Sequence, residues 1–323
     1  MSGWATAAVG TGTPAVTHLL ERAERRLEAV ARGHGEALAA HASPTLSAGG
    51  KRTRPLLVFL CGDCVESDRL VAGAVAVELL HMATLVHDDV LDRAPLRRGR
   101  PTVFVAGGRD AATATGDLLF SRAFAELAAT SDAAAVRALS AASSALVRGE
   151  LMQRADAFSP DVTEERYAER CKLKTGRLFE AACRIGALLG APGLAEDVLG
   201  SYGVRVGLAF QLLDDVLDVA GPPERTGKGR GTDLLDGTVT LPLILARERD
   251  PDLAELDLAA LAGPADAEAA CDRIAATGAL AESRERALGY VVDAKDLLAG
   301  AGLTGPLVRS LELVADGVVE RYA

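Results

Sequence analysis

The sequence has few aromatic residues and almost none of the alternation of β-branched and polar residues that is typical of β-strands. Phe, Trp and Tyr make up only 4% of the 323 residues. Alanine and leucine abound instead, and this composition favours helices over sheets. Charged residues interrupt every apolar stretch before it reaches the roughly 18 residues that a membrane-spanning helix needs. The composition therefore predicts a helical protein without a transmembrane segment.

The chain also lacks an excess of positive charge and a second cysteine pair. Its formal net charge of −10 argues against nucleic acid as a partner. The only C-x-x-C pair, Cys61 with Cys64, is a weak zinc or redox signal, so we interpret the cysteines as small buried helix residues. The N-terminus has neither the basic nor the apolar segment of a signal peptide. We expect a flexible lead over residues 1–15, one domain over residues 16–323 and a cytoplasmic location.

Apolar residues recur at helical spacing along most of the chain. The spacing between Leu19 and Ala31 predicts an amphipathic helix. The same pattern predicts further helices over residues 71–86, 111–127, 134–158, 164–189 and 194–219. Segments rich in glycine and proline separate several of them, at residues 95–108, 190–193 and 221–231. The helices that include Val86 and Val219 are apolar almost all round, so we expect other helices to surround them.

Each of these two central helices ends in the same five letters, D-D-V-L-D. The first aspartate cluster runs from Asp88 to Asp92 and the second from Asp214 to Asp218. Residues four apart share one face of a helix, so the first and last aspartates of each cluster present two carboxylates across one turn. Such close acids repel one another unless a cation lies among them, and hard oxygen ligands favour Mg²⁺ that is also bound by substrate phosphates. No EF-hand loop is present, which disfavours calcium.

Two basic clusters provide partners for an anionic substrate. The first, G-G-K-R-T-R-P over residues 49–55, places three cations after a glycine pair, where the beginning of a helix can cradle phosphate. The second, L-R-R-G-R-P-T over residues 96–102, follows the first aspartate cluster by a few residues. Because arginine matches phosphate oxygens bidentately, we interpret both clusters as diphosphate clamps.

Together these motifs resemble the motif series of the trans-isoprenyl diphosphate synthases. The similar segments occur in the family's order and spacing, at residues 49–55, 81–92, 97–99, 149–153, 174–175, 211–218 and 227–242. The stretch H-M-A-T-L-V-H-D-D is most similar to that of medium- and long-chain polyprenyl synthases. The resemblance implies an all-α fold, a single-domain isoprenoid synthase helical bundle around a deep central cavity. It also implies a homodimer.

The resemblance further implies an activity and a role for each motif residue. Such a prenyltransferase condenses isopentenyl diphosphate head-to-tail with an allylic diphosphate (geranyl, farnesyl or geranylgeranyl), using three Mg²⁺ ions. The implied metal ligands are Asp88, Asp92 and Asp214, with Asp89, Asp215 and Asp218 in supporting roles. The implied ligands of isopentenyl diphosphate are Lys51, Arg54, His81 and Arg98. The implied allylic-diphosphate ligands are Arg97, Lys174, Thr175, Gln211 and Lys228, of which Lys174, Thr175 and Gln211 are expected to be catalytic.

The resemblance also bears on product length. In the family the product grows along a wall formed one turn before the first aspartate cluster, where this chain has Ala83 and Thr84. Neither side chain is bulky, so we expect a medium- or long-chain all-trans polyprenyl diphosphate. A deeper floor at Met82, Phe120 or Phe124 would instead make the chain a geranylgeranyl diphosphate synthase.

The chain departs from the family at one position, and two other protein classes are alternatives. Thr238 stands where many members have lysine, which removes one diphosphate contact. A class I terpene cyclase would share the metal ligands but lack the isopentenyl-binding cations Lys51, Arg54 and Arg98. A catalytically silent regulatory subunit usually loses acids from one cluster, whereas this chain keeps all six. An active synthase is therefore the favoured interpretation.

Overall fold

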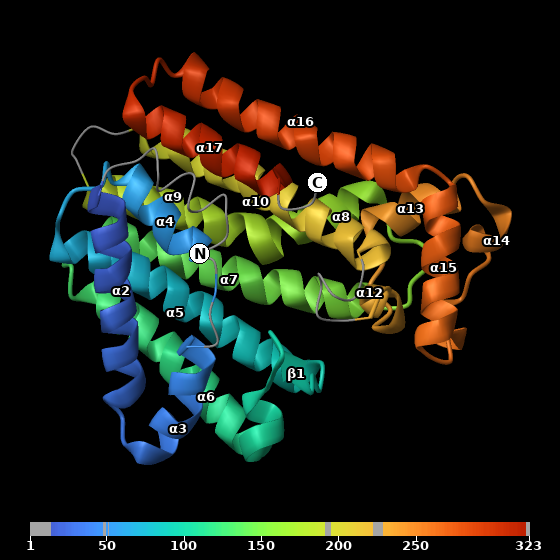
Figure 1. Cartoon of the computed structure of the whole chain (residues 1–323), viewed down its shortest axis with the longest axis horizontal. Coiled ribbons are helices and arrows are strands. Elements are labelled where there is room, and N and C mark those ends of the chain that lie inside the picture. Colours follow the sequence, from blue (N-terminus) through green and yellow to red (C-terminus); the bar gives the residue numbers. More distant parts are fainter. Residues whose placement is uncertain (1–13, 48–49, 51, 191–194, 222–228, 321–323) are drawn as a thin grey trace. The chain divides into compact units, whose positions relative to one another are not determined.

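The computed structural model describes residues 14–47, 50, 52–190, 195–221 and 229–320, and these are almost entirely helical (Figure 1). In chain order the first elements are α2 (Pro14–Arg32), α3 (Glu36–Ser47), α4 (Thr53–Cys61), α5 (Asp68–Leu91), β1 (Leu96–Arg97), β2 (Arg100–Pro101), α6 (Val103–Ala128) and α7 (Ala133–Asp156). Next come α8 (Glu164–Cys171), the π-helix η1 (Lys172–Gly176), α9 (Arg177–Leu189), α10 (Glu196–Ala220), α12 (Thr232–Leu235) and α13 (Leu241–Arg247). The last are α14 (Pro251–Ala254), the 3₁₀ helix η2 (Leu258–Ala260), α15 (Pro264–Ala276), α16 (Ala279–Gly300) and α17 (Pro306–Glu320). The predicted all-α class is confirmed.

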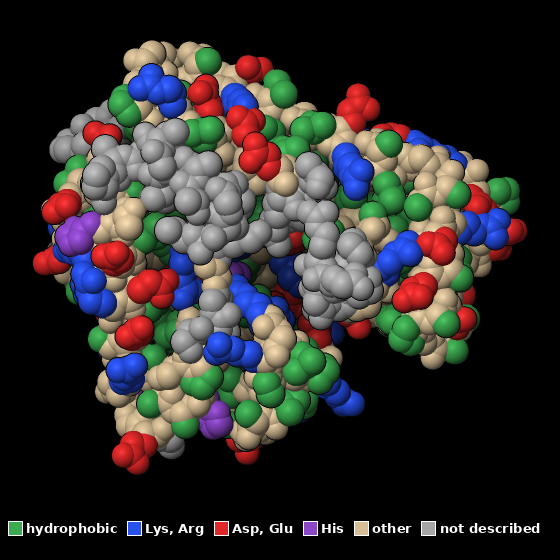
Figure 2. All heavy atoms as spheres, viewed as in Figure 1, with side chains coloured by type: hydrophobic (Ala, Val, Ile, Leu, Met, Phe, Trp, Pro, Cys, Tyr) green, Lys and Arg blue, Asp and Glu red, His purple; other side chains and the backbone are tan. Residues whose placement is uncertain are grey.

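The chain divides into two units. The first comprises residues 1–143, 178–203 and 298–314, and the second comprises residues 144–177, 204–297 and 315–323. On the face drawn in Figure 2, acidic and basic side chains are interspersed. The negative net charge is therefore not gathered into one patch on that face.

Helix α5 is the core of the first unit. The hydroxyl of Ser67 caps it by accepting a hydrogen bond from the backbone N–H of Arg69 at 3.1 Å. Helices α2, α4 and α6 pack against it, and α6 lies alongside it in Figure 1. By length and composition α5 could cross a membrane, but 78% of its most apolar window is buried inside the protein. Its apolar character is thus that of a helix surrounded by other helices, as the sequence predicts.

The predicted break over residues 95–108 was only partly right. A short hairpin pairs Leu96 with Pro101, and its turn residues Arg98 and Gly99 both have positive φ, as a two-residue type I′ turn requires. Helix α6 then begins at Val103 rather than at residue 111, because the Thr102 hydroxyl caps it at once. The expected interruption survives inside the helix as a kink at Gly108.

The second unit contains the second half of α7, α8, η1, most of α10 and the helices from α12 to most of α16. Helix α13 packs on α8, α14 and α15, while α12 packs on α15. Helices α13, α14 and α15, drawn in orange, are grouped together in Figure 1. Tyr167 of α8 is among the largest fully buried side chains. A buried tyrosine needs a partner for its hydroxyl, and that partner lies in the second aspartate cluster.

Candidate active site

The first aspartate cluster occupies the end of α5, and its three carboxylates differ in exposure. Asp89 is only 3% exposed, and its Oδ1 accepts a hydrogen bond from Arg97 Nε at 2.7 Å. Asp88 is half-buried, and Asp92, which ends the helix, is exposed. Asp89 therefore anchors the hairpin to α5, whereas Asp88 and Asp92 reach further toward solvent.

The hairpin brings Arg98 close to the glycine pair of the first basic cluster. A Cβ atom at Gly50 would lie 3.0 Å from Arg98 Nη1 and 3.3 Å from Arg52 Nη1. Glycine at this position therefore lets the backbone approach both guanidinium groups. The two basic clusters, separated in the sequence by α4 and α5, meet within the first unit.

Arg52, by contrast, forms ion pairs with acidic residues inside the fold. Its guanidinium pairs with Glu24 and, at 2.7 Å, with the buried Glu78, and it donates to the carbonyl of Leu46 at 2.8 Å. Arg52 itself adopts a left-handed backbone conformation just before α4. Arg52 is thus a structural cation of the first basic cluster. Lys51 lies outside the described residues.

His81 lies within the electrostatic influence of four arginines of the first unit. Its pKa lies well below the ordinary value because burial and the positive charges of Arg54, Arg98, Arg97 and Arg52 all disfavour the imidazolium form. A group of arginines around a neutral histidine is suited to a polyanion, which would supply the missing negative charge.

A small pocket opens beside this arginine group in the first unit. Arg97, Arg98 and Arg100 lie along one part of it. Its apolar wall is formed by Met82, Leu85, Val86, Val103 and Ala106. Anionic and apolar groups of a single ligand could therefore be accommodated within a short distance.

The second aspartate cluster occupies the end of α10, where Asp215 is the buried member. Its Oδ1 accepts from Gln211 Nε2 at 2.8 Å and its Oδ2 accepts from the Tyr167 hydroxyl at 2.6 Å. Burial and the charge of Asp233 raise the pKa of Asp215 to about 7, against the opposing effect of these two hydrogen bonds. Asp218 accepts a hydrogen bond from the backbone N–H of Asp233 at 3.2 Å.

Thr175 and Gln211 are hydrogen-bonded to each other. The Thr175 hydroxyl donates to Gln211 Oε1 at 2.6 Å. Thr175 lies in the π-helix Lys172–Gly176, a local widening of the helix that is often found at functional sites. A Cβ atom at Gly149 would lie 2.8 Å from the backbone nitrogen of Lys174, so glycine lets α7 contact the widened turn.

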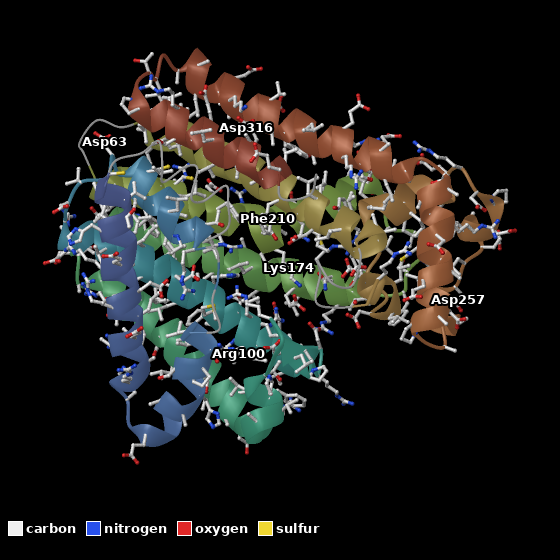
Figure 3. All side chains as sticks on the ribbon, in the orientation of Figure 1. Asp63, Arg100, Lys174, Phe210, Asp257 and Asp316 are labelled. Atoms are coloured by element: carbon white, nitrogen blue, oxygen red, sulfur yellow. The ribbon has the colours of Figure 1, made fainter. Side chains whose placement is uncertain are left out.

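Lys174, labelled in Figure 3, points to acceptors on α7. Its Nζ lies 2.6 Å from Glu150 Oε2 and donates to Gln153 Oε1 at 3.1 Å. Burial acts to raise the pKa of Glu150, but the charge and hydrogen bond of Lys174, with Arg154, outweigh it and hold the pKa below the ordinary value. The lysine is thus held by the G-E-x-x-Q motif in the protein without substrate.

The segment from Asp236 to Pro242 is fixed by residues that precede the π-helix. The backbone N–H of Phe158 donates to the carbonyl of Gly237 at 2.8 Å, and Arg170 donates to the carbonyl of Val239. Thr238 in this segment is half-buried, and its N–H donates to the carbonyl of Asp233 at 2.8 Å. Lys228, the remaining predicted cation, lies outside the described residues.

The carboxylates fit a magnesium ion that is shared with a substrate. No group of three His, Cys, Asp or Glu side chains among the described residues forms a complete metal site. Mg²⁺ accommodates this, because it retains waters and is usually bound by one or two carboxylates together with substrate phosphates. The donors of both clusters are hard oxygens, as Mg²⁺ prefers.

Sequence reasoning did not find Tyr167, Arg170 or Phe179. Tyr167 and Arg170 support the second aspartate cluster and the segment after it, and the ring of Phe179 lies under the Arg54 guanidinium. Each is a buried residue whose sequence neighbourhood looks like ordinary helix core. The sequence held one signal for Tyr167: it precedes Thr175 by about two helical turns, a spacing that places both side chains on the same face of a helix.

Comparison with known proteins identifies the family of this chain. The polyprenyl synthetase family model matches residues 36–276, which include both aspartate clusters and both basic clusters. The chain belongs to this family. It is 41% identical over 230 residues to the heptaprenyl diphosphate synthase component 2 of Geobacillus stearothermophilus, which covers 70% of this chain and 72% of the relative. It is 37% identical over 262 residues to the geranylgeranyl diphosphate synthase of Methanosarcina mazei, covering 78% and 80% of the two chains.

A solved polyprenyl synthetase has the same fold. The polyprenyl synthase of Caulobacter crescentus CB15, in complex with calcium and isoprenyl diphosphate, superposes with a TM-score of 0.90 at 33% identity. The match covers 100% of this chain and 99% of that one. With the family settled, the predicted enzyme class is confirmed: the chain is a trans-prenyltransferase.

Proposed function

We propose that this chain is a magnesium-dependent synthase of medium- or long-chain all-trans polyprenyl diphosphates. The observation that carries the proposal is the pair of identical D-D-V-L-D clusters, each at the end of a core helix and each with a buried aspartate anchored by hydrogen bonds. In this proposal the enzyme acts in the cytoplasm as a homodimer and needs no transmembrane segment.

The basic residues divide between two diphosphates. Isopentenyl diphosphate is bound by Arg54, His81 and Arg98, together with Lys51, and the arginine group around His81 supports this assignment. The allylic diphosphate is bound by Arg97, Lys174 and Lys228. For Lys174, binding means exchanging Glu150 and Gln153 for phosphate oxygens, and the amine already lies where several acceptors compete for it.

The chemistry is the ionisation and alkylation of the allylic substrate. Mg²⁺, when bound by the aspartates, would neutralise the leaving diphosphate. The allylic C–O bond breaks, and the oxygens of Thr175 and Gln211 face the resulting carbocation. The double bond of isopentenyl diphosphate attacks the cation and forms the new C–C bond. A proton then leaves to the departed diphosphate, which restores a double bond and produces an allylic diphosphate one isoprene unit longer.

Product length follows from the wall ahead of the first aspartate cluster. Ala83 is fully buried and Thr84 is half-buried, and neither side chain is large enough to stop a growing chain. The heptaprenyl relative favours a product longer than geranylgeranyl diphosphate, whereas the Methanosarcina relative keeps geranylgeranyl diphosphate as the alternative. The rings of Phe120 and Phe124 are 5.3 Å apart on α6 and remain candidates for a floor.

The test is product analysis of the purified chain with Mg²⁺, isopentenyl diphosphate and, separately, geranyl, farnesyl and geranylgeranyl primers. Products beyond geranylgeranyl length support the proposal, and a stop at that length supports the alternative. No extension with any primer contradicts a self-sufficient enzyme. That outcome would favour a subunit that needs a partner, as the word "component" in the name of the Geobacillus relative suggests.

A further inference from the structure

Four side chains of the second unit form one continuous hydrogen-bonded row. The hydroxyl of Tyr167 donates to Asp215 Oδ2 at 2.6 Å, and Gln211 Nε2 donates to Asp215 Oδ1 at 2.8 Å. Gln211 Oε1 in turn accepts the Thr175 hydroxyl at 2.6 Å. The row therefore begins at a buried tyrosine on α8 and ends at the oxygen that is proposed to face the carbocation.

The direction of the donors in this row is fixed by chemistry. Gln211 donates from its NH₂ group to Asp215 and accepts the Thr175 proton at its carbonyl oxygen, because an amide NH₂ group only donates and an amide oxygen only accepts. Thr175 has one hydroxyl proton, and donating it to Gln211 leaves the lone pairs of Oγ1 for the substrate side. An inverted Gln211 amide would instead turn the Thr175 proton toward the cation, which would repel it.

Tyr167 is itself held rigidly. Its side chain is 2% exposed, and the Arg170 guanidinium lies over its ring at 5.5 Å from the centroid. Arg170 also donates to the carbonyl of Val239 in the segment that carries Thr238. The tyrosine hydroxyl is thus fixed on the side of Asp215 opposite to Gln211.

We propose that Tyr167 is a positioning residue of the prenyl transfer reaction, acting through Asp215 and Gln211 to orient the Thr175 hydroxyl. The hydrogen bond from Tyr167 to Oδ2 of Asp215 holds the aspartate in one rotamer, in which Oδ1 faces Gln211. This inference rests on the proposed function. In the proposed role, Tyr167 acts on the reaction without contacting the metal or the substrate.

The experiment compares Tyr167→Phe with Tyr202→Phe. Tyr202 is a matched control, because it is also fully buried and its hydroxyl also donates at 2.6 Å, but to the backbone carbonyl of Leu311. Tyr167→Phe is expected to lower kcat about tenfold and leave KM for isopentenyl diphosphate unchanged, since one buried hydrogen bond to Asp215 is lost outside that binding site. Tyr202→Phe is expected to keep kcat while losing a similar amount of stability.

A double-mutant cycle with Thr175→Val tests the route through the row. If Tyr167 acts on Thr175, the tenfold effect of Tyr167→Phe shrinks to nearly nothing when Thr175 is already valine. Equal kcat losses in Tyr167→Phe and Tyr202→Phe, or a full effect of Tyr167→Phe in the valine background, would overturn the inference. A parent enzyme that is inactive with every primer would instead count against the proposed function, so the two failures are distinguishable.

Discussion

The guanidinium of Arg54 lies over the ring of Phe179, 4.7 Å from its centroid. Arg54 belongs to the first basic cluster, whereas Phe179 lies in α9 and is fully buried. The aromatic face attracts the cation and restricts the rotamers of a long side chain. Arg54 is therefore held in place next to His81 before any anion binds.

Phe179→Leu should raise KM for isopentenyl diphosphate several-fold with little change in kcat. Leucine fills most of the space but offers no ring face, so Arg54 gains rotamer freedom that binding must then remove. Steady-state kinetics with a saturating allylic primer measure the effect. Phe59→Leu, at another fully buried phenylalanine of the same unit, is the control. Equal KM changes in both variants would show that the effect is one of packing only.

The lowered pKa of His81 predicts acid sensitivity of the protein without substrate. In the unfolded chain histidine binds a proton below its ordinary pKa of about 6.5, whereas folded His81 does not. Because the unfolded state then binds more protons, the free energy of unfolding falls as the pH drops from about 6.5 toward the lower folded pKa. Urea unfolding of the parent and of His81→Gln, at a series of pH values below about 6.5, measures this fall in the free energy of unfolding. In the variant the free energy of unfolding should depend less on pH than in the parent.

Binding of inorganic diphosphate should raise the lowered pKa of His81. An anion among the arginines compensates their charge, so the pKa of His81 should rise on binding. A titration of the His81 ring signals by NMR, with and without diphosphate, checks the direction. An unchanged His81 titration with diphosphate bound would show that the anion lies elsewhere.

The aspartate clusters should be indispensable for turnover. Asp88→Ala and Asp214→Ala should each abolish product formation, because each removes a ligand that Mg²⁺ needs in addition to phosphate oxygens. The exposed Asp110, which lies outside both clusters, provides the control as Asp110→Ala. Full activity of either cluster variant, measured with radiolabelled isopentenyl diphosphate, would remove the metal assignment.

The helices were predictable because burial leaves a repetitive mark on the sequence, but their junctions were not. The unbroken apolar character of α5 identified a core helix, and six predicted helical regions contain helices in the structure. The early beginning of α6 escaped because its cap depends on one hydroxyl, that of Thr102, within a segment rich in glycine and proline. The π-helix escaped as well, because Lys172–Gly176 has no distinctive composition.

The same contrast holds in the site. Repeated charges such as the aspartate clusters can be read directly from the sequence, whereas the partner of each charge depends on tertiary contacts. Arg52 and Arg54 are two residues apart, yet the first is paired with Glu24 and Glu78 and the second lies over Phe179. Nothing in the local sequence separates their roles. Only the fold shows that Arg52 is paired with two glutamates and that Arg54 lies over an aromatic ring.

Thr84 offers the cleaner test of product length. Ala83 is fully buried, so a phenylalanine there would overpack the core and cost about 1–3 kcal/mol of stability. Thr84 is half-buried, and its hydroxyl only returns to the carbonyl of His81 at 2.8 Å. Thr84→Phe should therefore shorten the products without unfolding the chain, while Thr84→Ser should not. Chromatography of the dephosphorylated products measures their chain lengths. An unchanged length distribution in Thr84→Phe would mean that the growing chain lies along another wall.

Thr238→Lys should strengthen allylic substrate binding. Thr238 is half-buried in a segment whose backbone is held by Phe158 and Arg170, so a longer side chain can extend without moving that backbone. A lysine there restores a point charge for the diphosphate, and one added charge-assisted hydrogen bond corresponds to a KM lowered about tenfold. Because the added contact is made to the bound substrate as well as to the transition state, kcat should change little. Thr277→Lys, at the end of α15, is the control for a general increase in positive charge. A KM for farnesyl diphosphate that falls equally in both variants, or in neither, would mean that position 238 does not contact the diphosphate.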